Sequence, residues 1–264
     1  MWVVGNQAVR SGSSDLMRLV EDYTGKSSLW LEYFLGTLAH LPQINSQMEL
    51  EVITTCNDVQ RHEPIIRKNE RVHTVELRGI PSVVTIRVKS VLPEGITALK
   101  SQKLQGAVTI CDIGGGNTSI SRFYNGEPNG EVEVKDFGAE YLIERIATSS
   151  QLKALIEQPP NKDIINRSLE VGIKSKNKKP CLVYGDSNIN FYKVYETELQ
   201  DFINCRLREI IKRLEHYKLT GDKVLVIGGG SKLPLLSAAL KKKGFLISDN
   251  GAFDNLVGLV VEVA

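Results

Sequence analysis

The spacing of apolar residues divides this chain into short strands and amphipathic helices. Apolar positions alternate with polar ones over 48–54, 72–77 and 82–88, and alternation of this kind predicts β-strands. Helical spacing recurs from Trp30 onward and, most clearly, over 196–218, where seven apolar residues fall on one face. These seven are Leu199, Phe202, Ile203, Leu207, Ile210, Ile211 and Leu214. Mixed strands and helices of these lengths predict an α/β protein.

Two further strands are apolar throughout, and each runs directly into three glycines. The strand at 108–113 is followed by Gly114 to Gly116, and the strand at 224–227 by Gly228 to Gly230. Three glycines leave backbone N–H groups accessible and remove every Cβ that would block a ligand. Because α/β folds bind ligands at the carboxyl ends of their strands, the two turns predict two walls of one nucleotide cleft. Asp112, at the end of the first strand, is placed to hold a metal ion or its water.

Composition and charge narrow the class of protein. The 264 residues are 42% hydrophobic and 24% charged, with a net charge of +2, which favours an ordinary globular protein and argues against tight direct binding of nucleic acid. The four cysteines and four histidines are scattered, so buried free thiols are expected rather than a metal site. The start of the chain lacks the pattern of a signal peptide, and no apolar stretch approaches the length of a membrane span, so we expect a cytoplasmic protein without membrane contact.

Both glycine turns resemble motifs of one superfamily. The D-x-G-G-G-x-T pattern from Asp112 to Thr118 resembles the second phosphate loop of the ATPases that include actin, sugar kinases and heat-shock chaperones. The pattern from Gly228 to Ser231 resembles the adenosine motif of the same superfamily, and the two occur in the order and spacing found there. The plainer alternatives are a tight hairpin with a capping aspartate and a set of glycines that serves close packing.

Other segments extend this resemblance over most of the chain. The segment 88–95 resembles the one that orients the attacking water, with Glu94 as the candidate residue, and 136–140 resembles the strand-to-helix turn beneath the nucleotide, with Gly138 at its centre. The segment 253–258 resembles the final helix. The V-G-x-x-A pattern within 2–8 is similar to that of bacterial plasmid-segregation actins of the ParM/StbA type. Within the superfamily the chain is therefore most similar to that branch.

The resemblance implies an actin-like, ribonuclease H-like fold with two domains around a nucleotide cleft. It assigns 1–107 plus 253–264 to the first domain and 108–252 to the second, which carries both glycine motifs. The first phosphate hairpin of the superfamily, a D-x-G-x-x-x-x-K or similar turn, has no counterpart here, so the first domain is expected to be incomplete at its N-terminus. Without this hairpin, one side of the β- and γ-phosphates would be open to water, and this argues against hydrolysis by the chain alone. A second departure is Ser119, where relatives often carry another aspartate.

The resemblance also implies roles for individual residues around ATP or ADP with Mg²⁺. Asp112 would bind Mg²⁺ through water, and Glu94 would orient the attacking water. The backbone amides of the first turn would hold the β- and γ-phosphates, two side chains would add donors, and the second turn would line the adenosine pocket. In that order, these residues are Gly114, Gly115 and Gly116; Asn117 and Thr118; and Gly228, Gly229, Gly230 and Ser231.

The implied activity is that of an ATPase that polymerises head to tail and segregates plasmid DNA through a DNA-bound adaptor protein, with hydrolysis dependent on a first phosphate loop being supplied. Two alternatives remain open. One is a non-catalytic actin-like scaffold or truncated product that acts through protein contacts. The other is a different phosphotransferase of the superfamily, such as a small-molecule kinase or an exopolyphosphatase. The choice between ATP and GTP is also open, because a pocket lined by backbone leaves little trace of the base in the sequence.

Overall fold

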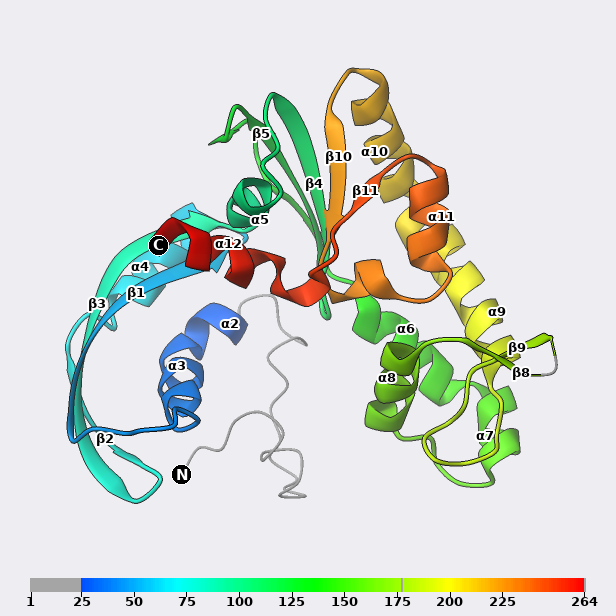
Figure 1. Ribbon diagram of the computed structural model, residues 1–264, viewed down its shortest axis with the longest axis horizontal. Helices are drawn as coiled ribbons and strands as arrows, with labels where there is room; N and C mark the ends of the chain where they lie inside the picture. Colours follow the sequence, from blue (N-terminus) through cyan, green and yellow to red (C-terminus); the bar gives the residue numbers. More distant parts are fainter. Residues whose placement is uncertain (1–24, 177, 264) are drawn as a thin grey trace. The chain divides into compact units, whose positions relative to one another are not determined.

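The structure is a computed structural model that describes residues 25–176 and 178–263 (Figure 1). Its contacts divide the chain into two compact units, with the boundary between Glu94 and Gly95. Each unit is described by itself. The segment 2–8 and the helix expected after Ser14 lie outside the described residues.

The first unit contains a three-stranded sheet in the order β1-β3-β2. Its strands are β1 (Gln47–Cys56), β2 (Val72–Leu77) and β3 (Ile80–Pro93), and its helices are α2 (Gly25–Ser28), α3 (Trp30–Leu38) and α4 (Val59–Arg67). Strand β3 pairs in parallel with β1 and antiparallel with β2. The three predicted strands are confirmed. β3 extends beyond the predicted 82–88 because its pairing with β1 continues to Pro93.

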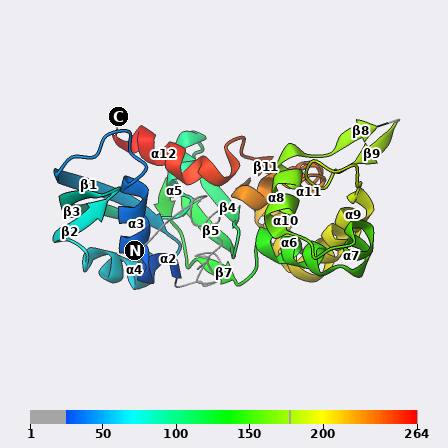
Figure 2. The same ribbon diagram turned by 90° about the horizontal axis from the view of Figure 1, so that it is seen from below.

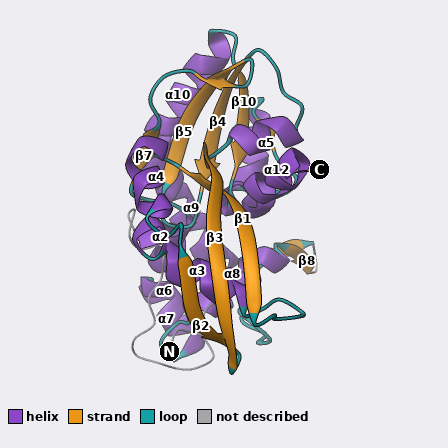
Figure 3. Cartoon of the chain, turned by 90° about the vertical axis from the view of Figure 1, so that its left-hand side faces the viewer, coloured by secondary structure: helices purple, strands orange, loops and turns teal. Residues whose placement is uncertain are grey.

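Alternation along β3 explains how this sheet makes its core. Val84, Ile86 and Val88 are buried while Arg87 and Lys89 between and after them are exposed, so one face of the strand is apolar. That face packs in one cluster with residues of α3 and α4, among them Trp30 and Ile66. Figure 3 looks onto the sheet with α3 behind it.

Helix α4 begins four residues earlier than the 63–71 expected from its charges. The side chain of Asp58 accepts a hydrogen bond from Arg61 N at 3.1 Å, which is the usual N-cap arrangement, and the helix starts at the next residue. The helix ends at Arg67, so the last predicted residues form the connection to β2.

The second unit is built on a sheet in the order β11-β10-β4-β5-β6, with β7 also paired to β5 (Figure 1). The strands are β4 (Ala107–Ile113), β5 (Thr118–Tyr124), β6 (Glu127–Pro128), β7 (Glu133–Lys135), β10 (Lys223–Ile227) and β11 (Leu246–Ile247). Strands β11, β10 and β4 are mutually parallel, and β5 returns antiparallel to β4 as a hairpin. The two apolar strands that precede the glycines are therefore confirmed, and they are neighbours at the centre of the sheet.

Helices cover both faces of this sheet. They are α5 (Ile96–Ser101), α6 (Ala139–Thr148), α7 (Ser150–Ile156), α8 (Lys162–Val171), α9 (Tyr192–Phe202), α10 (Arg208–Leu219), α11 (Leu236–Lys242) and α12 (Asp254–Val263), with a π-helical turn η1 (Ile203–Leu207) and 3₁₀ turns η2 (Gly229–Lys232) and η3 (Gly251–Phe253). Ile110 and Leu225 pack with Leu99 of α5, while Cys111 and Val226 belong to the larger core beneath the other helices. Burial on both faces explains why β4 and β10 are almost wholly apolar.

Three local predictions in this unit are wrong. The basic segment expected to be a loop at 174–180 forms a hairpin of β8 (Lys174–Lys176) and β9 (Lys179–Cys181). The strand expected at 191–194 is the start of α9, because its aromatic residues are buried at helical spacing and continue into Leu199. The single α-helix expected over 196–218 is interrupted by the π-helical turn η1.

The last helix packs closely on α5 (Figure 2). Asn255 Oδ1 accepts hydrogen bonds from Gly95 N at 2.9 Å and from Thr97 Oγ1 at 3.2 Å, and a methyl group at Gly258 would overlap the Thr97 backbone. Both helices were assigned to the first domain from the sequence, whereas the compact units place both after the Glu94/Gly95 boundary. The domain boundaries at 107 and 253 stay a prediction. No helix within 25–176 or 178–263 combines the length and hydrophobicity needed to cross a bilayer.

Candidate functional site: two interlocked glycine turns

The two glycine turns leave the sheet side by side. Strand β10 pairs in parallel with β4, and Ile227, the last residue before the second turn, is the register partner of Asp112. Parallel strands end at the same edge of a sheet, so both turns emerge there, which is the placement that the sequence predicted. The four cysteines are free thiols, as expected, but only Cys111 and Cys181 are buried, while Cys56 is half-buried and Cys205 is exposed.

The first turn closes the β4–β5 hairpin with one of its own amides. Gly114 N donates to the Asn117 carbonyl at 2.9 Å, so this amide is not available to a ligand, contrary to the role that the resemblance implied. Among the described residues, the amides of Gly115 and Gly116 have no protein acceptor. Both residues are half-buried. The turn therefore offers two donors rather than the expected three.

The start of α6 fixes the direction in which these two donors point. Ala139 N donates to the Gly114 carbonyl and Glu140 N to the Gly115 carbonyl, each at 2.9 Å. In a trans peptide the C=O and the following N–H point in opposite directions. Since both carbonyls point toward α6, the N–H groups of Gly115 and Gly116 both point away from it. Successive amides turned to one side form the concavity that binds anions.

Gly138 allows the turn to sit this close to α6. A methyl group at this position would overlap the carbonyl oxygens of both Gly114 and Gly115. The residue is buried and begins the helix as its N-cap. Its role in the structure is to seat the first turn on α6. The nucleotide contact that the resemblance implied for this residue stays a prediction.

The hydroxyl of Thr118 is engaged by the protein. Thr118 Oγ1 donates to the Phe137 carbonyl at 2.8 Å, and the side chain has no exposed surface. The geometry therefore assigns this hydroxyl to holding the hairpin on the strand-to-helix turn, in place of the expected contact with a phosphate. Asn117 remains half-buried, and Ser119, where relatives often carry an aspartate, is buried.

The second turn uses two of its three glycines for packing. A methyl group at Gly228 would overlap Asp112 Oδ1, and one at Gly230 would overlap Ile113 Cγ2 and lie 2.9 Å from the Ile113 carbonyl. Gly229 is different, because it is exposed and a methyl group there would meet only Ala252 Cβ, at 3.7 Å. The close-packing alternative therefore holds for Gly228 and Gly230, and Gly229 is the member left to face a ligand.

Ser231 closes the second turn from within. Its hydroxyl donates to the Gly228 carbonyl at 2.7 Å, its amide donates to the same oxygen at 3.1 Å, and the side chain is fully buried. The residue stabilises the turn and has no free hydroxyl surface for adenosine.

Asp112 is the carboxylate at the junction of the two turns. It is half-buried, and its Oδ1 lies against Gly228. A carboxylate oxygen is the type of ligand that Mg²⁺ prefers, and Mg²⁺ usually keeps several waters and takes the rest of its shell from phosphates. Within the described residues no group of three or more His, Cys, Asp and Glu side chains is placed to hold a metal. Asp112 thus fits a water-mediated Mg²⁺ contact and does not form a protein cage.

A buried network behind the second turn was missed by the sequence analysis. Gly228 N donates to the Gly251 carbonyl at 3.2 Å, and Ser248 Oγ accepts from Gln102 Nε2 at 3.3 Å and contacts Asp254 Oδ1. Asp254 is 1% exposed, and this burial raises the pKa of its carboxyl above the usual range. An aspartate in the first turn of a helix is so common that the sequence carries no signal for this role.

Glu94 directly follows the last residue of β3 in the first unit. Its amide donates a hydrogen bond to the Cys56 carbonyl at 2.8 Å. Burial, followed by the charge of Glu94, raises the pKa of the Cys56 thiol to about 12, so this thiol is protonated at neutral pH. The residue thus belongs to a different compact unit from the glycine turns, and its role in orienting water stays a proposal.

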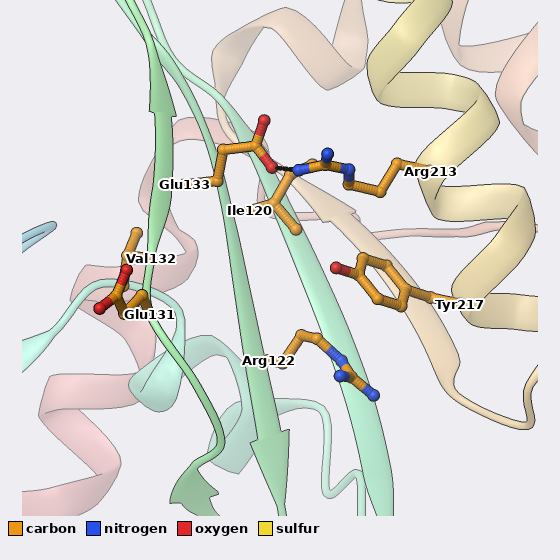
Figure 4. Close-up of a pocket in the computed structure, with 7 residues that line it drawn as sticks. All are labelled: Ile120, Arg122, Glu131, Val132, Glu133, Arg213 and Tyr217. Atoms are coloured by element: carbon orange, nitrogen blue, oxygen red, sulfur yellow. Dashed lines mark ion pairs between the residues drawn. The ribbon is translucent and has the colours of Figure 1, made fainter.

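A pocket on the β5 side of the sheet contains none of the predicted site residues (Figure 4). Its volume is about 410 Å³, and its lining comes from β5, the segment around β7 and α10. Arg213 forms an ion pair with Glu133 across it, and Arg122 pairs with Asp222 at 3.2 Å. Since both arginines that line the pocket are already paired with carboxylates, it does not single out a charged ligand.

Comparison with known proteins identifies the fold. No protein-family model and no curated protein matches the chain. Among solved structures, the archaeal actin homologue Ta0583 in complex with ADP matches with a TM-score of 0.66 and 18% identity over 90% of this chain and 80% of its own. ParM of Bacillus thuringiensis with AMPPNP matches with a TM-score of 0.67 and 17% identity over 96% and 77%. The actin-like protein Alp7A matches with a TM-score of 0.63 and 13% identity over 96% and 76%. The chain therefore has the actin-like fold.

Proposed function

We propose that this protein binds ATP or ADP with Mg²⁺ at the interlocked glycine turns. The observation that carries the proposal is the pair of amides at Gly115 and Gly116, which have no acceptor among the described residues and point to one side. This arrangement suits the oxygens of a phosphate chain. That solved relatives of the same fold were obtained with ADP, ATP and AMPPNP supports the choice of ligand.

In this proposal each part of the site has one task. The amides of Gly115 and Gly116 hold the β- and γ-phosphates, with Asn117 beside them. The open face of Gly229 takes the nucleoside, and Asp112 holds Mg²⁺ through water. When bound, Mg²⁺ supplies positive charge that offsets the charge of the phosphates. Glu94 orients the attacking water if the protein hydrolyses ATP.

The wider activity that we propose is that of a filament-forming actin-like ATPase of the plasmid-segregation type in the cytoplasm. The fold shared with ParM and Alp7A supports it. Copies of the chain would join head to tail, an interface that gives open filaments. A DNA-bound adaptor protein would connect the filament to its cargo, since a net charge of +2 does not favour direct binding of DNA.

The binding proposal is tested by filling the open face of the second turn. Gly229→Val places a side chain where the nucleoside would lie, and we expect ATP affinity, measured by calorimetry, to fall at least about tenfold through steric exclusion. Ala238→Val, at an exposed position of α11, is the matched control and should leave the affinity unchanged. Absence of ATP binding by the parent, or equal binding by Gly229→Val, would contradict the proposal.

Two further assays separate the alternatives that remain. Sedimentation of polymer upon addition of ATP supports the filament protein, and release of phosphate without an acceptor supports an ATPase. ATP binding without polymer or phosphate release would favour the non-catalytic scaffold. Transfer of phosphate to a sugar or other small acceptor would favour a kinase of the same superfamily.

A further inference from the structure

The π-helical turn between α9 and α10 changes which residue of the helix is buried. In an uninterrupted α-helix the fourth residue after Phe202 lies on the same face, and that residue is Arg206. The π-helical turn at Ile203–Leu207 adds one residue to the turn. Leu207 is therefore buried together with Phe202, while Arg206 stays exposed. The π-helical turn thus leaves Arg206 at the surface, next to the buried side chains of Phe202 and Leu207.

The guanidinium of Arg206 lies over aromatic rings of the α6 segment. Its centre is 4.6 Å from the ring centroid of Tyr141 and 5.9 Å from that of Phe137, and Nη2 lies 3.4 Å from the Tyr141 hydroxyl. Phe202, one turn earlier, stacks on Tyr141 at 6.0 Å and meets Phe137 edge-on at 6.3 Å. The helix thus holds both rings with an aromatic and a cationic contact.

These two rings flank the segment that seats the first glycine turn. The Phe137 carbonyl accepts the hydrogen bond from Thr118, and Gly138 follows directly. The amides of Ala139 and Glu140 then hold the carbonyls of Gly114 and Gly115. A continuous series of contacts therefore runs from Arg206 through the rings to the peptide groups that orient the two accessible amides.

We propose that Arg206 is a positioning residue for the first glycine turn. It fixes Phe137 and Tyr141, and through them the start of α6, so that the amides of Gly115 and Gly116 keep the orientation needed for an anion. Its effect on nucleotide affinity rests on the proposed function, whereas its effect on the turn does not.

Hydrogen exchange at two amides tests the effect on the turn. In Arg206→Ala we expect the amides of Ala139 and Glu140 to exchange about two- to five-fold faster, the factor that corresponds to one cation–π contact at an exposed site. Arg206→Lys keeps a cation over the rings and should restore most of the protection. Arg208→Ala is the matched control, because this arginine is exposed and makes no ion pair or ring contact among the described residues. Both alanine variants should still unfold in one cooperative urea transition, so that the faster exchange reports on the start of α6 and not on loss of the fold.

Each outcome bears on the proposal. Equal exchange in Arg206→Ala and Arg208→Ala would overturn it, whether or not the protein binds nucleotide. Faster exchange together with a two- to five-fold loss of ATP affinity would support it in full. Faster exchange with unchanged ATP affinity would overturn the claim that the contact matters for the ligand. If the parent binds no ATP at all, the proposed function fails and the exchange result alone decides whether Arg206 positions the turn.

Discussion

Both turns contain three consecutive glycines, but these glycines have different structural roles in the two turns. In the first turn the important property is the direction of the peptide groups, because the carbonyls of Gly114 and Gly115 are held by α6 and the following amides point outward. In the second turn the important property is the missing Cβ, because Gly228 and Gly230 lie against the first turn with no room for a methyl group. A run of glycines therefore does not by itself identify the residues that meet a ligand.

The difference also shows how the two turns depend on each other. The second turn packs on Asp112 and Ile113, the residues that lead into the first. Packing at Gly228 and Gly230 thus supports the first turn from one side, and α6 supports it from the other. A ligand held by the first turn would depend on residues that it never touches, and single substitutions in the two turns separate these contributions.

The largest effect is expected from Gly228→Ala. Its methyl group would overlap Asp112 Oδ1, and the φ of 84° at this position is strained for any residue with a Cβ. We expect a loss of about 3 kcal/mol in the free energy of unfolding, measured with urea. Gly229→Ala, the neighbouring control with open space, should cost less than about 1 kcal/mol. Equal losses in the two variants would remove the distinction between packing and ligand-facing glycines.

A smaller loss is expected from Thr118→Val. This nearly isosteric change leaves the Phe137 carbonyl without its 2.8 Å hydrogen bond in a partly buried place, at a cost of about 1–3 kcal/mol in the free energy of unfolding. Thr118→Ser keeps the hydroxyl and should retain most of the stability. If Thr118→Val unfolded like the parent but lost ATP affinity, the hydroxyl would contact the ligand, as the sequence resemblance first implied.

Asp112→Asn should weaken binding of Mg²⁺ and leave the stability of the fold unchanged. The amide keeps the shape of the side chain against Gly228 but removes the charge that favours Mg²⁺. We expect the affinity for ATP in the presence of Mg²⁺ to fall about tenfold, and the affinity in EDTA to stay the same, as measured by calorimetry. An equal loss with and without Mg²⁺ would assign Asp112 to the shape of the turn instead.

The smallest effect is expected from Asp254→Asn, and it depends on pH. Burial raises the pKa of this carboxyl in the folded state, so the folded protein holds its proton more tightly than the unfolded chain does. The resulting loss of stability is absent below about pH 4 and develops as pH rises above that value. Asp254→Asn should therefore raise the melting temperature at pH 7 relative to the parent and change it less at pH 4. A variant that is less stable at pH 7 would show that the ionised carboxylate stabilises the network with Ser248.

The elements that the sequence predicted well are those set by local pattern. The apolar strands β4 and β10, the alternating strand β2 and the glycine turns follow from spacing and composition, and their adjacency follows from the rules of α/β folds. The individual roles could not be predicted in the same way. The use of the Gly114 amide and of the Thr118 hydroxyl depends on peptide groups of the hairpin and of Phe137, whose positions no motif specifies.

The π-helical turn shows how a local pattern can conceal a feature. Phe202 and Leu207 are five residues apart and both buried, which already departs from α-helical spacing. Ile203 lies four residues before Leu207 and completes an apparent α-helical face, so the sequence favoured one continuous helix. Only the structure shows that Ile203 is half-buried and that Arg206 is kept outside the core.

The most direct test of the central claim follows the glycine amides themselves. Protein labelled with ¹⁵N-glycine is titrated with ATP and Mg²⁺, and the amide resonances are assigned with single-glycine variants. Our account predicts that the resonances of Gly115, Gly116 and Gly229 shift, while those of exposed glycines in other turns, such as Gly130 and Gly221, do not. Shifts confined to other glycines, or no shift at saturating ATP, would contradict the claim that these turns hold the nucleotide.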